Sequence, residues 1–158
     1  MAERTSAGIL LYRRAGDGAL EVLLAHPGGP FFAKRDLGDW TIPKGEPDAT
    51  ETDLSAVARR EFAEETGTDI GPATPMIELG SIVQKGGKVV HAWAVEGDLD
   101  PATAVSNEFE VEWPPRSGRR QRFPEIDRVA WFGLDEARTQ IKETQVPLID
   151  RLEAALRG

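Results

Sequence analysis

The sequence of 158 residues contains no cysteine. Disulfide bonds, thiolate nucleophiles and thiolate metal sites are therefore excluded. Long hydrophobic runs are also missing, since the longest apolar stretch near the start, AGILLY, is far too short to span a bilayer. No basic segment precedes a cleavable hydrophobic stretch either. We therefore expect a cytoplasmic protein that does not act in a membrane.

Basic residues are in the minority, with 19 lysines and arginines against 27 aspartates and glutamates and a net charge of -8. A protein with this charge does not attract a phosphate backbone through its overall field, so nucleic acid is not expected as a partner. A smaller polyanion could still be bound by local basic residues or through bound cations. The length and the apolar content of 40% fit one globular domain over residues 1–158, either as a monomer or as a homodimer.

Short apolar runs separated by turn signals predict most of the strands. SAGILLYRR and EVLLAHP flank the turn AGDGA, and a second pair of runs flanks Gly86-Gly87, so two hairpins are expected. WTIPKGE predicts a short strand that ends at Pro43. SNEFEVEWP and RVAWFGL predict two more strands, and PPRSGRRQRFPEID between them is expected to be a loop.

Three helices are expected, the first from about Asp53 to Gly67 and the others over 134–141 and 147–156. Strands come first, then one helix, then more strands and the C-terminal helices. This order predicts an α+β fold with a mixed sheet and helices on its faces.

The stretch ARREFAEETG places three glutamates near the end of the first helix. On a helical wheel, the apolar stripe that would face the core consists of Leu54, Val57, Ala58 and Phe62. Glu61, Glu64 and Glu65 fall inside this stripe or at its margin. Carboxylates gathered there would repel one another and lose hydration unless cations compensated them. The alternative, a solvated acidic surface, conflicts with this phase of the helix.

A hard divalent cation suits such a cluster, because Mg²⁺ and Mn²⁺ prefer carboxylate oxygens and Mg²⁺ often shares its shell with substrate phosphates. A metal would also allow an acidic protein to bind a polyphosphate.

The stretch GEPDATETDLSAVARREFAEETGT resembles the Nudix box, written G-x5-E-x7-R-E-U-x-E-E-x-G-U, where U is an aliphatic or similar residue. Gly45 opens it, Glu51 follows six residues later, and REFAEETG closes it. Eight residues rather than seven separate Glu51 from Arg60, so either Glu51 or Thr52 occupies the first glutamate position. The final position, usually aliphatic, is Thr68.

Resemblance to the Nudix family implies an α/β/α sandwich around a central mixed sheet, and Mg²⁺-dependent hydrolysis of a nucleoside diphosphate linked to another group, with Mn²⁺ as an alternative metal. It implies that Arg60 braces the loop before the helix. The expected metal ligands are Glu61, Glu64, Glu65 and the carbonyl of Gly45. One glutamate of the box or of a later loop would act as the general base. Glu125 is a candidate for that role or for a further metal ligand, and the alternative is a loop residue that caps the next strand.

Several basic residues could contact the phosphates of a nucleotide substrate. The candidates are Lys44, Lys85, Lys88, Arg116, Arg119 and Arg120. The arginines are unusual because, with Arg122, four lie within seven residues of an acidic chain, and the guanidinium group suits phosphate. A basic loop that balances local acids is the alternative.

The PKG sequence at the opening of the box resembles that of Nudix enzymes that cut dinucleoside polyphosphates, so we expect a substrate such as diadenosine tetraphosphate. A housecleaning nucleoside triphosphate pyrophosphatase is the nearest alternative, followed by enzymes for nucleotide sugars or ADP-ribose. A Nudix domain that has lost catalysis and only binds a ligand is the alternative from another functional class.

Overall fold

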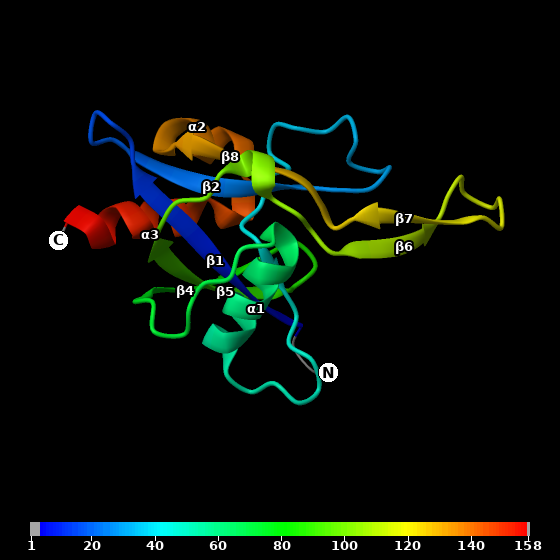
Figure 1. The fold of residues 1–158 in the computed structure, drawn as a ribbon, viewed down its shortest axis with the longest axis horizontal. Coiled ribbons are helices and arrows are strands. Elements are labelled where there is room, and N and C mark those ends of the chain that lie inside the picture. The colour runs from blue at the N-terminus through cyan, green and yellow to red at the C-terminus, as the bar shows by residue number, and fades with distance from the viewer. Residues whose placement is uncertain (1–3, 158) are drawn as a thin grey trace.

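The computed structural model describes residues 4–157 and contains a mixed sheet with helices on both faces (Figure 1). The strands are β1 Thr5–Arg14, β2 Leu20–Pro27, β3 Lys44–Gly45, β4 Ile77–Val83, β5 Val89–Glu96, β6 Glu108–Glu112, β7 Arg120–Pro124 and β8 Ile126–Gly133. The helices are α1 Leu54–Thr66, α2 Leu134–Gln140 and α3 Val146–Arg157, with short 3-10 turns η1 Pro101–Thr103 and η2 Glu143–Gln145. Within this range no helix is long and apolar enough to cross a membrane.

The main sheet has the order β4-β5-β1-β2-β8, and β3 pairs with β1. β1 runs parallel to β5, and the other pairs are antiparallel. The predicted mixed sheet of an α/β/α sandwich is therefore confirmed.

β1 is buried along most of its length because helices cover both of its faces. Ile9 and Leu11 pack in the core with Val57 and Phe62 of α1. Leu10 lies in a second core on the opposite face, with residues of α2 and α3. The strand alternates between two cores, so its sequence reads as one continuous apolar run.

β1 and β2 pair only beside their turn, from Tyr12 with Val22 to Arg14 with Leu20. Farther along, the two strands separate and the segment 41–45 lies between them. Thr41 bridges to β2, and β3 pairs with Ala7 and Gly8 of β1. A Cβ atom at Gly8 would lie 2.6 Å from the carbonyl oxygen of Pro43, so this insertion requires a glycine. The insertion brings β3 beside α1.

Two expectations for the strands are wrong. The regular strand after Trp40 is Lys44–Gly45, beyond Pro43, because a proline has no N–H to donate to a ladder whereas Lys44 and Gly45 face β1. The segment expected as a loop contains β7, which pairs with β6 through Phe109 opposite Phe123 and Val111 opposite Gln121. Figure 1 shows β6 and β7 as an arm that extends away from the main sheet.

Candidate active site

Helix α1 begins and ends where its sequence predicts. The side chain of Asp53 accepts hydrogen bonds from the backbone N–H groups of Ser55 and Ala56, at 3.0 and 3.4 Å, and so caps the first turn. Gly67 ends the helix in the left-handed conformation with φ 78°, and its N–H donates to the carbonyl of Ala63. The helix buries Val57, Ala58 and Phe62, and with this rotation Glu61 and Glu65 lie against β3.

The carboxylate of Glu61 lies directly over the backbone of β3. A Cβ atom at Gly45 would lie 1.9 Å from its Oε2 atom, so only glycine leaves room for this side chain. The Glu61 side chain is only 12% exposed, and burial raises the pKa of its carboxyl group. The carboxylate thus lies in a poorly hydrated position, as the helical phase predicted.

Arg60 joins helix α1 to the preceding loop. Its Nε and Nη2 atoms donate to the two carboxylate oxygens of Glu51 at 2.8 and 2.6 Å, and Nη2 also donates to the carbonyl of Glu46 at 3.2 Å. A two-pronged contact of this kind fixes both partners in orientation. Its Nη1 atom donates to Glu61 at 2.9 Å and to both carboxylate oxygens of Glu64 at 3.1 Å.

Glu65 and Lys44 meet where α1 approaches β3. The backbone N–H of Lys44 donates to Glu65 Oε1 at 3.2 Å. Burial raises the pKa of Glu65 to about 8, and the nearby charges of Glu61 and Glu125 act in the same direction. Burial also lowers the pKa of the Lys44 amine to about 8, with further contributions from Lys88 and Lys142. Neither group has its usual hydration.

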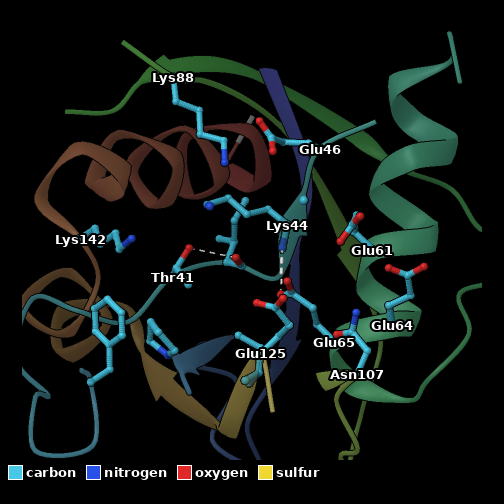
Figure 2. A pocket seen from close by; sticks show the side chains of 15 residues that line it. Thr41, Lys44, Glu46, Glu61, Glu64, Glu65, Lys88, Asn107, Glu125 and Lys142 are labelled. Atoms are coloured by element: carbon cyan, nitrogen blue, oxygen red, sulfur yellow. Dashed lines mark hydrogen bonds between the residues drawn. The ribbon is translucent and has the colours of Figure 1, made fainter. Parts of the chain in front are cut away.

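These side chains line one cavity of about 430 Å³. Figure 2 shows Glu61, Glu64 and Glu65 along α1 on one side of it and Lys44, Lys88 and Lys142 on the other. Glu125 extends toward Glu65 between the two sides, and burial raises its pKa as well. The remaining wall includes Phe32 and Asn107. The cavity therefore has an acidic wall along α1 that faces a basic wall of three lysines, and a further carboxylate, Glu46, lies beside Lys88.

Among residues 4–157, no three acidic or histidine side chains already have the arrangement of a metal site. The ion pairs of Arg60 explain this, because its Nη1 atom draws Glu61 and Glu64 to itself. Arg60 is bonded to one carboxylate oxygen of Glu61, which leaves the other free, and to both oxygens of Glu64. Their chemistry nevertheless fits Mg²⁺, which prefers hard carboxylate oxygens.

Comparisons with known proteins agree with this geometry. The sequence model of the NUDIX domain matches residues 2–152. The chain belongs to the Nudix family. It is 29% identical over 142 residues to the asymmetrical bis(5'-nucleosyl)-tetraphosphatase of Sus scrofa, an alignment that covers 84% of this chain and 80% of the pig protein.

Two solved Nudix structures share the fold. The NUDIX domain of Shewanella oneidensis NrtR, complexed with ADP ribose, has a TM-score of 0.67 at 18% identity and covers 99% of this chain and 90% of its own. A binary complex of a C. elegans Ap4A hydrolase has a TM-score of 0.66 at 22% identity, and the match covers 97% of this chain and 98% of the C. elegans chain. The predictions of a Nudix fold and of a Nudix pyrophosphohydrolase are thus confirmed.

The loop before α1 contains both candidates for the first glutamate position of the Nudix box. Glu51, rather than Thr52, reaches Arg60. The loop is held by Asp48, whose carboxylate accepts from the N–H groups of Thr50 and Glu51 at 2.8 and 3.1 Å. Hydrogen bonds of Asp48 and Glu51 thus order the loop that precedes α1.

The structure brings together most of the predicted site residues but not all of them. The cavity is lined by Lys44, Gly45, Glu61, Glu64, Glu65, Lys88 and Glu125, and Arg60 lies beside it. Lys85 lines a neighbouring cavity instead. Arg116, Arg119 and Arg120 lie on the arm, at or near the turn between β6 and β7, and line neither cavity. Arg120 is paired with Glu110 at 2.6 Å on the arm itself.

Lys142 and Asn107 are cavity residues that the sequence did not reveal. Lys142 lies between α2 and η2, and Asn107 directly precedes β6. Each is a single polar residue outside any motif, and only the packing of distant segments brings it to the box.

Proposed function

We propose that this Nudix protein uses Mg²⁺ to hydrolyse a phosphoanhydride bond in a nucleoside diphosphate-linked substrate, with a dinucleoside polyphosphate such as diadenosine tetraphosphate as the preferred substrate. The facing acidic and basic walls of one cavity carry this proposal. A substrate of this class needs both walls, because its phosphates require cations on one side and a metal site on the other. The similarity to the pig tetraphosphatase supports the choice of substrate.

The residues of the acidic wall fit the metal. Glu61, Glu64 and Glu65 would hold Mg²⁺ together with the carbonyl of Gly45, and Glu125 would add a carboxylate from the other side. Bound Mg²⁺ lowers the pKa of water and neutralises charge on phosphate oxygens. The raised pKa values of Glu61 and Glu65 accord with this role. Both carboxylates are poorly hydrated, and a bound Mg²⁺ would stabilise the negative charge that water does not stabilise there.

The residues of the basic wall hold the phosphate chain. The ammonium groups of Lys44, Lys88 and Lys142 face the cavity and suit nonbridging phosphate oxygens. In the hydrolysis, the oxygen of water bonds to one phosphorus atom while the bond from that phosphorus to the bridging oxygen breaks. A cavity carboxylate takes the proton of the water, and the bridging oxygen leaves on the second phosphate.

A substrate panel with Mg²⁺ tests this function. It should contain dinucleoside polyphosphates, normal and oxidised nucleoside triphosphates, ADP-ribose and nucleotide sugars. We expect the highest kcat/KM for a dinucleoside polyphosphate. Preference for a nucleoside triphosphate would contradict this choice of substrate and favour a housecleaning pyrophosphatase. Turnover of no substrate with Mg²⁺ or Mn²⁺ would contradict hydrolysis and favour a ligand-binding module.

A double variant tests the assignment of the site. Glu64→Gln with Glu65→Gln should lower Mg²⁺-dependent kcat by about two orders of magnitude or more, since it removes two ligand charges and leaves the shapes unchanged. Glu78→Gln with Glu136→Gln is the matched control, because these two exposed glutamates lie outside the cavity. Equal activity of the two double variants would refute the acidic wall as the catalytic site.

A further inference from the structure

A second cavity of about 510 Å³ lies next to the proposed catalytic cavity. Its walls come from the loop at Arg35–Asp39, the turn after β4 at Gln84–Lys85, and the segment from the end of α2 through η2. Its volume falls within the range of about 300–1,000 Å³ that is typical of small-molecule sites. Lys142 lines both cavities, so they meet at this residue.

Three lysines line the catalytic cavity up to this junction. Within residues 4–157, the ammonium groups of Lys44, Lys88 and Lys142 form no ion pair within 4.0 Å. Burial and the nearby charge of Lys88 lower the pKa of Lys142. Three such groups around one cavity would repel one another, and a chain of phosphates is the ligand that relieves this repulsion.

The two arginines that line the second cavity are neutralised by the protein. Arg35 is paired with Asp39 at 3.3 Å. Arg138 is paired with Asp150 at 2.9 Å and with Glu153 at 2.7 Å. Lys85 also lines this cavity and, within residues 4–157, forms no ion pair within 4.0 Å, while Glu143 adds one negative charge to the lining. Both arginines therefore already have carboxylate partners and are not free for a phosphate.

Neutral polar groups and apolar side chains complete its lining. Thr139 and Thr144 contribute hydroxyl groups, and Ile141 and Val146 contribute apolar surface. The side-chain oxygen of Gln84 already accepts from Gln145 at 2.7 Å, which leaves the amide N–H donors of Gln84 for another partner. Hydrogen-bonding groups beside apolar walls suit an uncharged molecule with a flat ring and several polar atoms, such as a nucleoside.

We propose that the second cavity binds the distal nucleoside of a dinucleoside polyphosphate, whose phosphate chain runs from the acidic wall past Lys44, Lys88 and Lys142. This inference rests on the proposed function and adds to it a reason for selectivity. A substrate with nucleosides at both ends fills both cavities, whereas a nucleoside tetraphosphate with the same number of phosphates fills only the catalytic one. The protein thereby selects substrates both by the length of the phosphate chain and by the presence of a nucleoside at its far end.

The test blocks the second cavity from its rim. Thr139 is exposed, lines this cavity and donates its hydroxyl to the carbonyl of Glu136 at 2.8 Å. Thr139→Trp should reduce kcat/KM for diadenosine tetraphosphate about tenfold relative to kcat/KM for adenosine tetraphosphate, through KM. Thr103→Trp is the matched control, because Thr103 is also exposed, makes the same contact with the carbonyl of Asp100 at 2.8 Å and lines neither cavity.

Calorimetry with nonhydrolysable, methylene-bridged analogues of both nucleotides measures binding without turnover. We expect Thr139→Trp to weaken binding of the dinucleoside analogue alone and Thr103→Trp to weaken neither. Thr139→Leu, with a smaller side chain, replaces the tryptophan variant if that variant does not fold. An unchanged ratio of the two substrates in the Thr139 variants would overturn the second cavity as a nucleoside site while leaving hydrolysis intact. Failure of the unmodified protein to hydrolyse either substrate would instead refute the proposed function.

Discussion

The carboxylate of Glu61 occupies the space in which a side chain at Gly45 would begin, since a Cβ atom at Gly45 would lie 1.9 Å from Glu61 Oε2. The first residue of the Nudix box and one of its glutamates are thus linked by close packing, although 16 positions separate them in the chain. Lys44 and Gly45 form β3, and Glu61 projects from α1, so the contact also fixes the distance between the strand and the helix.

Gly45→Ala should therefore lower the activity of the protein without unfolding it. The clashing atoms are at the end of a flexible side chain, so Glu61 can move away, and we expect a loss of no more than about 1 kcal/mol in the free energy of unfolding. The displaced carboxylate should lower kcat by about tenfold to a hundredfold. Urea denaturation and steady-state kinetics measure the two effects. Gly16→Ala is the control, because a Cβ atom there meets no atom within 4 Å. Parallel losses of stability and activity would contradict a purely local displacement.

Glu51 and Thr52 can be distinguished as partners of Arg60. Glu51→Gln should lower the thermal midpoint and kcat, because it weakens the two-pronged contact that holds the loop against α1. Thr52→Val should change neither property measurably. Thermal denaturation and kinetics of both variants give the answer. A larger effect at Thr52 would mean that the extra residue of the box lies elsewhere.

Glu65 should make the stability of the metal-free protein depend on pH. Its pKa rises from 4.5 to about 8 on folding, so the folded state binds this proton more tightly than the unfolded state. The resulting stabilisation is complete below pH 4.5 and is lost as the pH rises toward 8. Lys44 acts in the opposite sense only above pH 8, where its lowered pKa begins to favour the folded state.

Glu65→Gln should therefore be more stable than the unmodified protein at pH 8, by about 4 kcal/mol, and should lose this advantage near pH 4.5. Urea denaturation in the presence of a chelator, at several values between pH 4.5 and 8, measures the difference. A difference that stays constant over this range would show that the carboxyl group is not buried as described.

Local signals explain which parts of the fold could be predicted from the sequence. Asp53 and Gly67 mark the ends of α1 because an N-cap and a left-handed C-terminal residue act within a few residues of the chain. The turns at AGDGA and at Gly86-Gly87 specify their hairpins in the same local way. The helical phase likewise located the acidic wall, because it depends only on α1.

The remaining features depend on contacts between distant segments. β7 has no alternating apolar pattern, and it becomes a strand because Phe123 and Gln121 find partners on β6. Lys142 joins the basic wall because the segment after α2 runs beside the residues at Trp40–Thr41, before β3. The backbone N–H of Lys142 donates to the carbonyl of Trp40 at 2.8 Å. No spacing rule relates these positions, so neither could be found by reading along the chain.

His26 should position the loop that contributes to both cavities. It is fully buried, with its Nδ1 atom 2.9 Å from Asp127 Oδ1 and its Nε2 atom against the carbonyl oxygen of Arg35. His26→Leu removes both contacts and should destabilise the protein by about 2 kcal/mol, with a rise in KM that exceeds the fall in kcat. His91→Leu, at the other histidine of the chain, is the control. A change in kcat alone would indicate a direct role in the chemical step.

We expect Lys142 to contribute to binding of the substrate phosphates and the arginines of the arm not to contribute. Lys142→Ala should raise KM for diadenosine tetraphosphate about tenfold, because it removes an unpaired cation from the junction of the two cavities. Arg119→Ala with Arg120→Ala should leave KM within about twofold of the value for the unmodified protein. Exposed charges far from a site contribute little to binding, because solvent and salt screen them. Steady-state kinetics at low and at physiological salt compare the variants. A larger effect of the arginine pair would mean that the arm folds back over the cavity when substrate binds, because its residues line neither cavity in the present arrangement.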